Sequence, residues 1–139
     1  MVAPDGLGEI NEKYGRTGGD HIVKEVVDFL KGNVDADEHL VHIDGANFVI
    51  LLTDTDLKDA RRKGLLLKAK ISNRTFEFDS SSISLTLSVG VVARTPSPEG
   101  TKVDIKEVVE EFLRRLEAML DQAKQQGGDK MAEDEDTQF

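Results

Sequence analysis

The sequence predicts an α+β domain in which helices flank a mainly antiparallel sheet. Two apolar runs, residues 40–43 and 48–52, flank a polar break at residues 44–47, and the Asp-Gly pair in this break is a strong hairpin signal. Apolar and small polar residues alternate along residues 83–93, as in a half-buried strand. Elsewhere apolar residues recur every three or four positions, which is the spacing of amphipathic helices. This mixture of hairpins and helices indicates an α+β fold.

The first part of the chain predicts the end of a strand and then two helices. Strands average about five or six residues, so we expect residues 1–3 to be the last part of one, as in a domain cut from a longer protein. An unusually short edge strand is the alternative. Residues 7–14 predict a short helix, and the glycine-rich residues 15–19 predict a loop. Asp20 fits the N-cap of a second helix that ends near Gly32.

The predicted hairpin leads into a capped helix. Residues 48–52 are apolar at every position, so we expect this strand to be covered on both faces. Residues 53–56 read Thr-Asp-Thr-Asp, which ends the strand and supplies a helix cap. The helix then runs from Leu57 to about Ile71, because apolar residues mark one of its faces.

Two further strands follow this helix. Residues 75–78 alternate as a short strand, and the polar cluster at residues 79–82 ends it in a loop. Residues 83–93 then predict one long strand. One face of that strand is apolar, and the other carries small and polar residues.

The last part of the chain predicts a loop at residues 96–100 and a long amphipathic helix. Asp104 is a good cap for this helix, and Gly127 and Gly128 end it. Residues 131–139 are acidic and poor in apolar residues, so they predict a disordered tail. The complete order of elements is typical of a ferredoxin-like α+β sandwich. The predicted buried stripe of the long helix consists of Ile105, Val108, Val109, Phe112, Leu113, Leu116, Met119, Leu120 and Ala123.

The amino-acid composition argues against several classes of function. The net charge of −9 argues against nucleic acid and membrane partners, because both require a cationic surface. The absence of cysteine excludes disulfides, thiolate metal sites and a cysteine nucleophile. No apolar run approaches the ~20 residues that span a bilayer. No secretion signal is visible at the N-terminus, so we expect a cytoplasmic protein.

Four motifs together resemble a known family. Residues 3–20 read APDGLGEINEKYGRTGGD and resemble the D-x-D-x-F-K-x-x-N-D-x-Y-G-H-x-x-G-D segment of GGDEF domains, the diguanylate cyclases. Residues 42–48, HIDGANF, fall where that family has R-x-G-G-D-E-F. Residues 88–91, SVGV, look like its S-x-G-hydrophobic strand, and residues 123–130, AKQQGGDK, look like its A-K-x-x-G-R-N-R segment. The family's usual N-terminal helix and most of its first strand have no counterpart here.

The resemblance implies a degenerate catalytic signature. In this family, two GTP-loaded domains meet, and metal ions held by carboxylates activate the attacking hydroxyl. The resemblance places the first-strand metal aspartate at Ala3, the metal-binding acid of the signature at Ala46 and the following glutamate at Asn47. Alanine cannot bind a hard cation, so we expect no metal, no other cofactor and no cyclase activity. The degenerate signature comprises Asp44, Gly45, Ala46, Asn47 and Phe48.

The positions that read guanine are better preserved. Asn11 and Asp20 match the family's residues that hydrogen-bond the base, and Lys124 matches its phosphate lysine. The family's following arginine is Gly128 here, which weakens the phosphate contacts. One alternative function is therefore a sensor that binds GTP weakly. The simpler interpretation is that Asp20 is an N-cap and Asn11 is a polar helix residue.

The family's inhibitory site for cyclic di-GMP, R-x-x-D, has no working counterpart. The matching positions are Asp35 and Glu38, and neither supplies a guanidinium to a phosphate. A less favoured alternative is a residual diguanylate cyclase that holds its ions with Asp5 and Asp44 in place of the lost acids.

The resemblance thus implies a degenerate GGDEF domain at residues 1–130, with the nucleotidyl-cyclase palm fold, followed by the acidic tail at residues 131–139. The function expected from it is regulatory or protein-interacting, in bacterial signalling. The expected partner is another protein or domain, and a homodimer is consistent with the surfaces that bring two domains of this family together.

Overall fold

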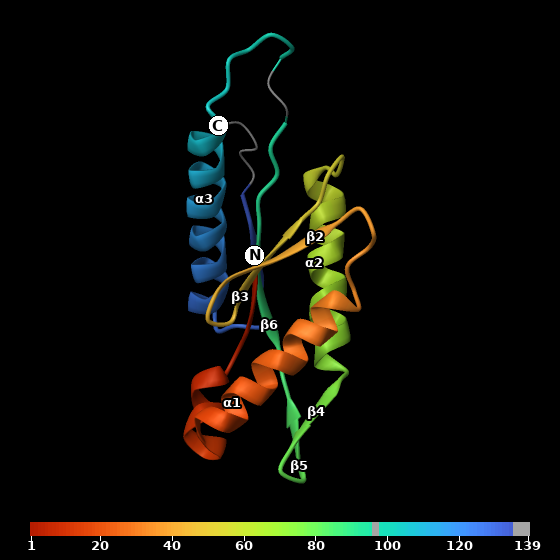
Figure 1. Cartoon of the computed structure of the whole chain (residues 1–139), viewed down its shortest axis with the longest axis vertical. Helices are drawn as coiled ribbons and strands as arrows, with labels where there is room; N and C mark the ends of the chain where they lie inside the picture. Colours follow the sequence, from red (N-terminus) through yellow and green to blue (C-terminus); the bar gives the residue numbers. More distant parts are fainter. Residues whose placement is uncertain (96–97, 135–139) are drawn as a thin grey trace.

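The computed structural model describes residues 1–95 and 98–134 (Figure 1). The predicted loop at residues 96–100 lies partly outside the described residues. Within the described ranges, the elements follow in the order β1 (Val2–Pro4), α1 (Leu7–Lys31), β2 (His39–Asp44), β3 (Asn47–Leu51), α2 (Leu57–Ser72), β4 (Thr75–Phe78), β5 (Ser81–Ser84), β6 (Leu87–Val91), α3 (Ile105–Gln125) and β7 (Met131–Glu133).

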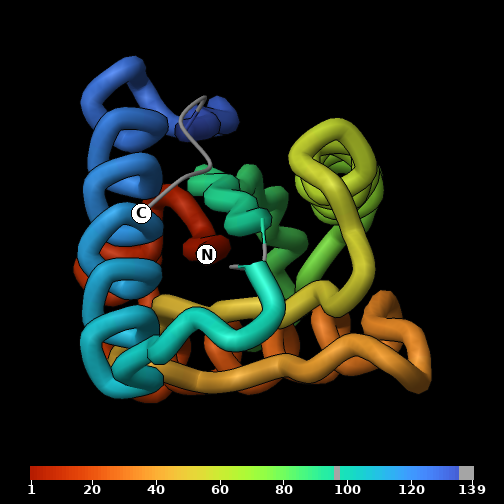
Figure 2. The backbone as a smooth tube through the Cα atoms, turned by 90° about the horizontal axis from the view of Figure 1, so that it is seen from above, coloured from red at the N-terminus to blue at the C-terminus, as the bar shows by residue number. Residues whose placement is uncertain are grey.

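A sheet of five strands, among the described residues, forms the middle layer in the order β2-β3-β1-β6-β7. All neighbouring strands are antiparallel except β6 and β7, which run parallel. Helices α1 and α2 pack on one face of this sheet and α3 packs on the other (Figure 2). Strands β4 and β5 form a separate hairpin at one end of the molecule (Figure 1). The predicted α+β class with a mainly antiparallel sheet is confirmed.

The larger core lies between the sheet and helices α1 and α2. Ile22, Val26 and Leu30 of α1 are completely buried there, and Phe48 of β3 is 1% exposed. A smaller apolar cluster, comprising Met1, Ala3, Leu116 and Leu120, lies between the sheet and α3. Burying one such aliphatic side chain contributes about 1.5–3 kcal/mol, so both clusters hold the sheet between its helices.

Strand β1 lies in the middle of the sheet, so the alternative of a short edge strand is wrong. Val2 pairs with Phe48 of β3 and with Val89 of β6. Met1 extends the pairing by one residue: its amine donates to the Gly90 carbonyl oxygen at 2.8 Å, and its own carbonyl accepts from the Gly90 N–H at 2.9 Å. Burial lowers the pKa of this amine from 8.0 to about 5.

The predicted hairpin is confirmed, but the expectation that its second strand is covered on both faces is wrong. Phe48 points into the large core, whereas Leu51 is 51% exposed. Val41, on the neighbouring strand β2, is 45% exposed. The reason is that β2 is an edge strand, and the helix on this face, α3, packs mainly on β6 and β7. Strand β3 is internal to the sheet, as predicted, but an apolar run alone does not establish that a strand is covered on both faces.

Helix α1 joins the two predicted helices into one kinked element. The kink is at Gly15, whose φ of 74° and ψ of 176° interrupt the helical backbone. Asp20 lies inside this helix, so its prediction as an N-cap is wrong. Gly18 and Gly19 lie within the helix, where their missing side chains leave room for neighbouring side chains. A β-carbon at Gly18 would lie 2.5 Å from the Tyr14 β-carbon. These two glycines therefore allow side chains to pack closely against the helix, and they do not form the predicted loop.

The predicted long strand at residues 83–93 is two strands in different sheets. Its first part is β5, which pairs with β4 across a turn at Asp79 and Ser80. Its second part is β6, which pairs with β1 and β7. Thr86, between the two strands, donates a hydrogen bond from its hydroxyl to Asp5. Alternation along the sequence cannot reveal this change of sheet, because both strands keep the same period.

The C-terminal predictions are partly wrong. Only the second half of the predicted α3 stripe reaches the core, since Ile105 is 71% exposed and Val109 is 49% exposed. Residues Met131–Glu133 of the predicted disordered tail form β7, and Ala132 is buried. Residues 135–139 lie outside the described residues.

Both predicted helix caps on α2 and α3 are present. The Asp56 carboxylate accepts a hydrogen bond from the Asp59 N–H at 2.8 Å, and the Asp104 carboxylate accepts one from the Lys106 N–H at 3.0 Å. Among the described residues, no helix combines the length and the apolar character that a membrane span requires.

Candidate functional site

The tip of the β2–β3 hairpin satisfies its own polar groups. The Asn47 side-chain amide donates a hydrogen bond of 2.7 Å to the Asp44 carboxylate. His42 Nε2 lies 2.6 Å from the Gly45 carbonyl oxygen, which can only accept, so this nitrogen carries the hydrogen. The His42 ring stacks on Phe48 with 4.5 Å between ring centroids. Phe48 therefore anchors a tip whose polar atoms bind one another.

Alanine occupies two central positions of this site. Ala3 is 2% exposed and belongs to the apolar cluster under α3, with Leu116 and Leu120. Ala46 lies in the turn of the hairpin and is half-buried. Neither methyl group offers an oxygen or nitrogen to a cation. Among the described residues, no three His, Cys, Asp or Glu side chains lie close enough together to hold a metal ion.

Asp5, directly after β1, is fully engaged in structural hydrogen bonds. Its carboxylate accepts from the hydroxyl of Thr86 at 2.7 Å and from the hydroxyl of Ser88 at 2.6 Å. It also accepts from the backbone N–H of Asp129 at 2.8 Å. Ser88 is completely buried. A carboxylate has about four lone-pair sites, so three of those on Asp5 bind Thr86 before β6, Ser88 in β6 and the turn before β7.

A depression of about 220 Å³ brings the hairpin tip and α3 together. It is lined by Asp44 and Asn47 of the hairpin and by Glu117, Asp121 and Lys124 of α3. The candidate phosphate residue Lys124 therefore does lie beside the degenerate signature. Three carboxylates share this depression with a single ammonium, so its charge disfavours a triphosphate.

The candidate guanine residues lie close together on α1, because the kink at Gly15 folds the helix back. A β-carbon at Gly19 would lie 1.6 Å from Asn11 Oδ1, so the Asn11 side chain lies directly against Gly19, the residue before Asp20. Both candidate side chains are exposed. The helical backbone at Asp20 also removes its structural explanation as an N-cap.

The positions that match the inhibitory site hold an acidic loop in place. The Glu38 carboxylate accepts from the Asp35 N–H at 2.8 Å and forms an ion pair of 2.9 Å with Lys63 of α2. Burial raises the pKa of Glu38, but the hydrogen bond from Asp35 and the charge of Lys63 outweigh it and hold the pKa below its usual value. Glu38 therefore ties this loop to α2.

Sequence reasoning missed the partners of Asp5 and the acidic side of the depression. The alternating pattern places Thr86 and Ser88 on a small polar strand face, and their spacing contains no sign of a carboxylate 81 and 83 residues away. Glu117 and Asp121 follow one another at helical spacing on the same helix as Lys124. That spacing was the available signal for a negative surface next to the lysine.

Comparisons with known proteins agree on one family. The family model described as diguanylate cyclase, GGDEF domain, matches residues 1–130. Diguanylate cyclase DgcP of Pseudomonas aeruginosa is 27% identical over 127 residues, which are 91% of this chain and 18% of that protein. Response regulator PleD of Caulobacter vibrioides is 29% identical over 129 residues, 91% of this chain and 27% of that protein. The chain thus spans about a fifth to a third of the length of such relatives.

Solved structures share the fold at lower identity. The GGDEF domain of YfiN from Pseudomonas aeruginosa superposes with a TM-score of 0.80 at 20% identity, over 96% of this chain and 79% of that one. Diguanylate cyclase SiaD, crystallised in complex with its activator SiaC, gives a TM-score of 0.81 at 22% identity, over 96% of this chain and 48% of that one.

Proposed function

Because the chain belongs to the GGDEF domain family of diguanylate cyclases, we propose that it is a catalytically inactive member that acts by contacting another protein or domain. The observation that carries this proposal is alanine at both positions that the family resemblance gives to metal carboxylates. Ala3 is enclosed in an apolar cluster, and Ala46 sits in a hairpin turn whose polar neighbours bind one another. As a GGDEF protein it is proposed to act in bacterial signalling, in the cytoplasm.

The expected loss of cyclase activity follows from the chemistry of the reaction. A metal ion contributes several kcal/mol by stabilising developing charge on a phosphoryl group. Each 1.36 kcal/mol changes a rate about tenfold. Loss of two carboxylates from such a site is therefore expected to lower turnover by several orders of magnitude, even if the nucleotide still binds.

A cyclase assay tests this proposal directly. The purified chain, incubated with GTP and Mg²⁺, is expected to give no cyclic di-GMP above the level of a reaction without protein. The matched variant carries Ala3→Asp, Ala46→Asp and Asn47→Glu, with its fold checked by circular dichroism. Product formed by the unchanged chain would contradict the proposal, whatever the variant does.

The partner role is supported by a structural neighbour. The SiaD structure contains that cyclase in complex with an activator protein. For this chain, the proposed partner is likewise a protein or a protein domain, including a second copy of the chain. Size-exclusion chromatography with light scattering is expected to distinguish a monomer from a homodimer.

A guanine-nucleotide sensor is the second candidate. Asn11 and Asp20 favour it, because both are exposed and Asp20 does not cap a helix. The carboxylates around Lys124 oppose it, since they repel phosphate. NMR titration with GTP, and with ATP as a control, decides between these arguments. Shifts at Asn11 and Asp20 that GTP causes and ATP does not would favour the sensor, and their loss in Asn11→Ala would locate its site.

A residual cyclase that uses Asp5 and Asp44 is the least favoured candidate. Asp5 already accepts three hydrogen bonds, and Asp44 accepts one from Asn47. A cation would have to displace these donors. If any turnover is measured, an Asp44→Ala variant with unchanged turnover would exclude this candidate.

A further inference from the structure

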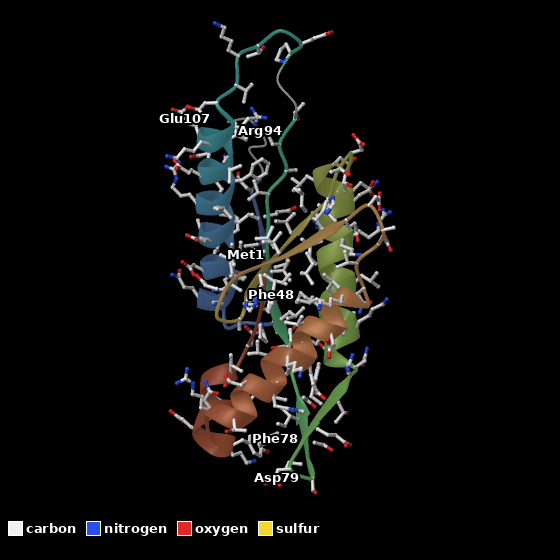
Figure 3. All side chains as sticks on the ribbon, in the orientation of Figure 1. Met1, Phe48, Phe78, Asp79, Arg94 and Glu107 are labelled. Carbon is white, nitrogen blue, oxygen red and sulfur yellow. The ribbon has the colours of Figure 1, made fainter. Side chains whose placement is uncertain are left out.

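Helix α2 carries apolar side chains on the side that faces away from the sheet. Its inner side is buried, and Leu67 and Ile71 belong to the larger core there. On the outer side, Leu65 is 47% exposed and Leu66 is 48% exposed. Figure 2 shows α2 at the edge of the molecule, and Figure 3 shows Phe48 on the inner side of this helix. The outer side of α2 is therefore open to a partner.

The exposed residues of α2 form two parallel ridges, because residues four apart lie next to one another on a helix. One ridge consists of Lys58, Arg62, Leu66 and Lys70, and the other consists of Arg61, Leu65 and Ala69. Ridges of this kind interlock with the ridges of a second helix. We call the outward-facing set the α2 surface, and it comprises Lys58, Arg62, Leu65, Leu66, Ala69 and Lys70.

The charge of α2 is opposite in sign to the net charge of −9 of the whole chain. Its acidic residue is Asp59, and its basic residues are Lys58, Arg61, Arg62, Lys63, Lys68 and Lys70. Other elements neutralise three of these cations through the ion pairs Arg61–Glu133, Lys63–Glu38 and Lys68–Asp129. These three pairs lie on the flanks of the helix, so they do not involve the cations of the α2 surface.

The cations of the α2 surface lie on the same ridge as Leu66. Lys70 donates a hydrogen bond of 2.9 Å to the side-chain oxygen of Asn33, which carries no charge. Asp59 offsets one cation, since it lies 3.6 Å from Arg62 in an exposed ion pair. The α2 surface therefore combines two exposed leucines with an excess of positive charge.

These features fit a helix of a partner protein. The backbone groups in the middle of α2 are hydrogen-bonded within the helix, so this surface offers no ladder to an added strand. A helix with apolar residues every three or four positions can contact Leu65 and Leu66 at the same time. Acidic side chains on either side of that stripe would then face the cations of the α2 surface. Charge complementarity thus specifies an acidic amphipathic helix.

The charges of the chain argue against two other occupants. A second copy that docked its own α2 here would bring two basic ridges together, and like charges repel. A membrane is far wider than a helix, which measures about 10–12 Å across. An anionic membrane would therefore also face the acidic remainder of the chain and repel it. A single helix covers the α2 surface alone.

We propose that the α2 surface binds an acidic amphipathic helix of a partner protein, with the apolar stripe of that helix on Leu65 and Leu66 and its carboxylates beside Lys58, Arg62 and Lys70. This inference deepens the proposed interaction role and rests on it for the existence of a partner. Its test measures peptide binding and not cyclase activity, so each of the two proposals can fail while the other stands.

The test uses the whole chain and the acidic helical peptide acetyl-SEELAELLEELAEALE-amide. Titration up to about 1 mM peptide is expected to shift the NMR amide signals of Leu65, Leu66 and Ala69 in a saturable manner. Raising NaCl from about 50 mM to about 500 mM is expected to weaken this binding about tenfold, because salt screens the charges. The peptide acetyl-SKKLAKLLKKLAKALK-amide keeps the apolar stripe and reverses the charge. It is expected to leave these three signals unchanged.

Two sets of protein variants locate the binding. Leu66→Glu places a carboxylate among the apolar contacts and is expected to abolish binding of the acidic peptide. Val109→Glu, at a position of α3 that is exposed to the same degree, is the matched control and is expected to bind normally. A chain with both Lys58→Glu and Arg62→Glu is expected to lose the acidic peptide and to bind the basic one, with shifts at the same three signals.

Three results would overturn the proposal. The first is the absence of saturable shifts at about 1 mM acidic peptide. The second is equal binding of the acidic and the basic peptide by the unchanged chain. The third is that vesicles containing phosphatidylserine, or a higher protein concentration alone, shift the three signals while the acidic peptide does not. That result would indicate a membrane or a second copy as the occupant.

Discussion

Asn47 donates a 2.7 Å hydrogen bond to Asp44, so the two polar residues at the ends of the hairpin turn are partners of one another. Here they close the turn. The tip therefore has a structural role that can be measured separately from any catalytic one.

The first prediction concerns this pair. Asn47→Ala is expected to lower the free energy of unfolding by about 0.5–1 kcal/mol, the usual contribution of one hydrogen bond. Asp44→Ala should have a similar effect, and the double variant should lose less than the sum of the two, because both remove the same bond. Urea denaturation measures all three. Additive losses would show that the bond contributes nothing in solution.

The second prediction concerns Asp5. Asp5→Ala is expected to lower the free energy of unfolding by about 2–3 kcal/mol, because it leaves the buried Ser88 hydroxyl without its acceptor. Asp37→Ala, at an exposed loop position, is the matched control and should change stability by less than about 0.5 kcal/mol. Guanidinium denaturation measures both. An Asp5→Ala chain as stable as the control would refute the structural role given to this carboxylate.

The third prediction is a pH dependence that originates at the Met1 amine. Its pKa is about 5 in the folded chain and 8.0 without the effect of burial, so between these pH values the unfolded chain binds more protons. Stability is therefore expected to fall as the pH decreases from 8 to 5. At 1.36 kcal/mol per pKa unit, the full effect is about 4 kcal/mol.

The control for this prediction is the same chain acetylated at its N-terminus. Acetylation removes the titrating amine. Urea midpoints at pH 8 and pH 5.5 are measured for both chains, and the difference between the chains cancels the titration of the three histidines. If both chains show the same pH dependence, the amine is solvated in solution and the prediction is wrong.

The fourth prediction concerns the contact between β6 and α3. A β-carbon at Gly90 would lie 2.6 Å from the Leu120 backbone nitrogen and 2.9 Å from the Leu116 carbonyl oxygen. Since backbone cannot rotate away, Gly90→Ala should displace α3 and lower stability by about 2–3 kcal/mol. Gly8→Ala, in α1 with open space around it, should be neutral or stabilising by up to about 1 kcal/mol. Thermal melts compare the two, and equal midpoints would contradict this packing.

The fold could be predicted from the sequence where local patterns decide it. The hairpin, α2 and the cap of α3 follow from turn chemistry, helical spacing and Asp104. Predictions failed where contacts between residues far apart in the sequence decide the structure. Gly18 and Gly19 are typical of a loop, but they lie in a helix because Tyr14 and Asn11 need the space that their missing side chains leave. Strand β7 is too short and too acidic to be predicted, and it exists because β6 offers it a free edge.

Only part of the candidate site could be predicted from the sequence. The family resemblance placed Lys124 and the degenerate signature in one functional site, and both line the same depression. The hydrogen bonds of Asp5 join residues far apart in the chain, which no local pattern contains. The carboxylates of Glu117 and Asp121 beside Lys124 did have a signal in the sequence, because they lie at helical spacing on the same helix. The register of β1 between β3 and β6 could not be predicted either, because the pairing joins residues more than 40 positions apart.

The position of β1 also has a mechanical consequence. A force applied to Met1 along the strand axis loads the hydrogen bonds to β3 and β6 in shear, on both sides and at the same time. Asp5, at the other end of the strand, passes the load to β6 and to the turn that follows α3. Tension at the N-terminus therefore reaches both neighbouring strands directly and, through Asp5, the turn that follows α3.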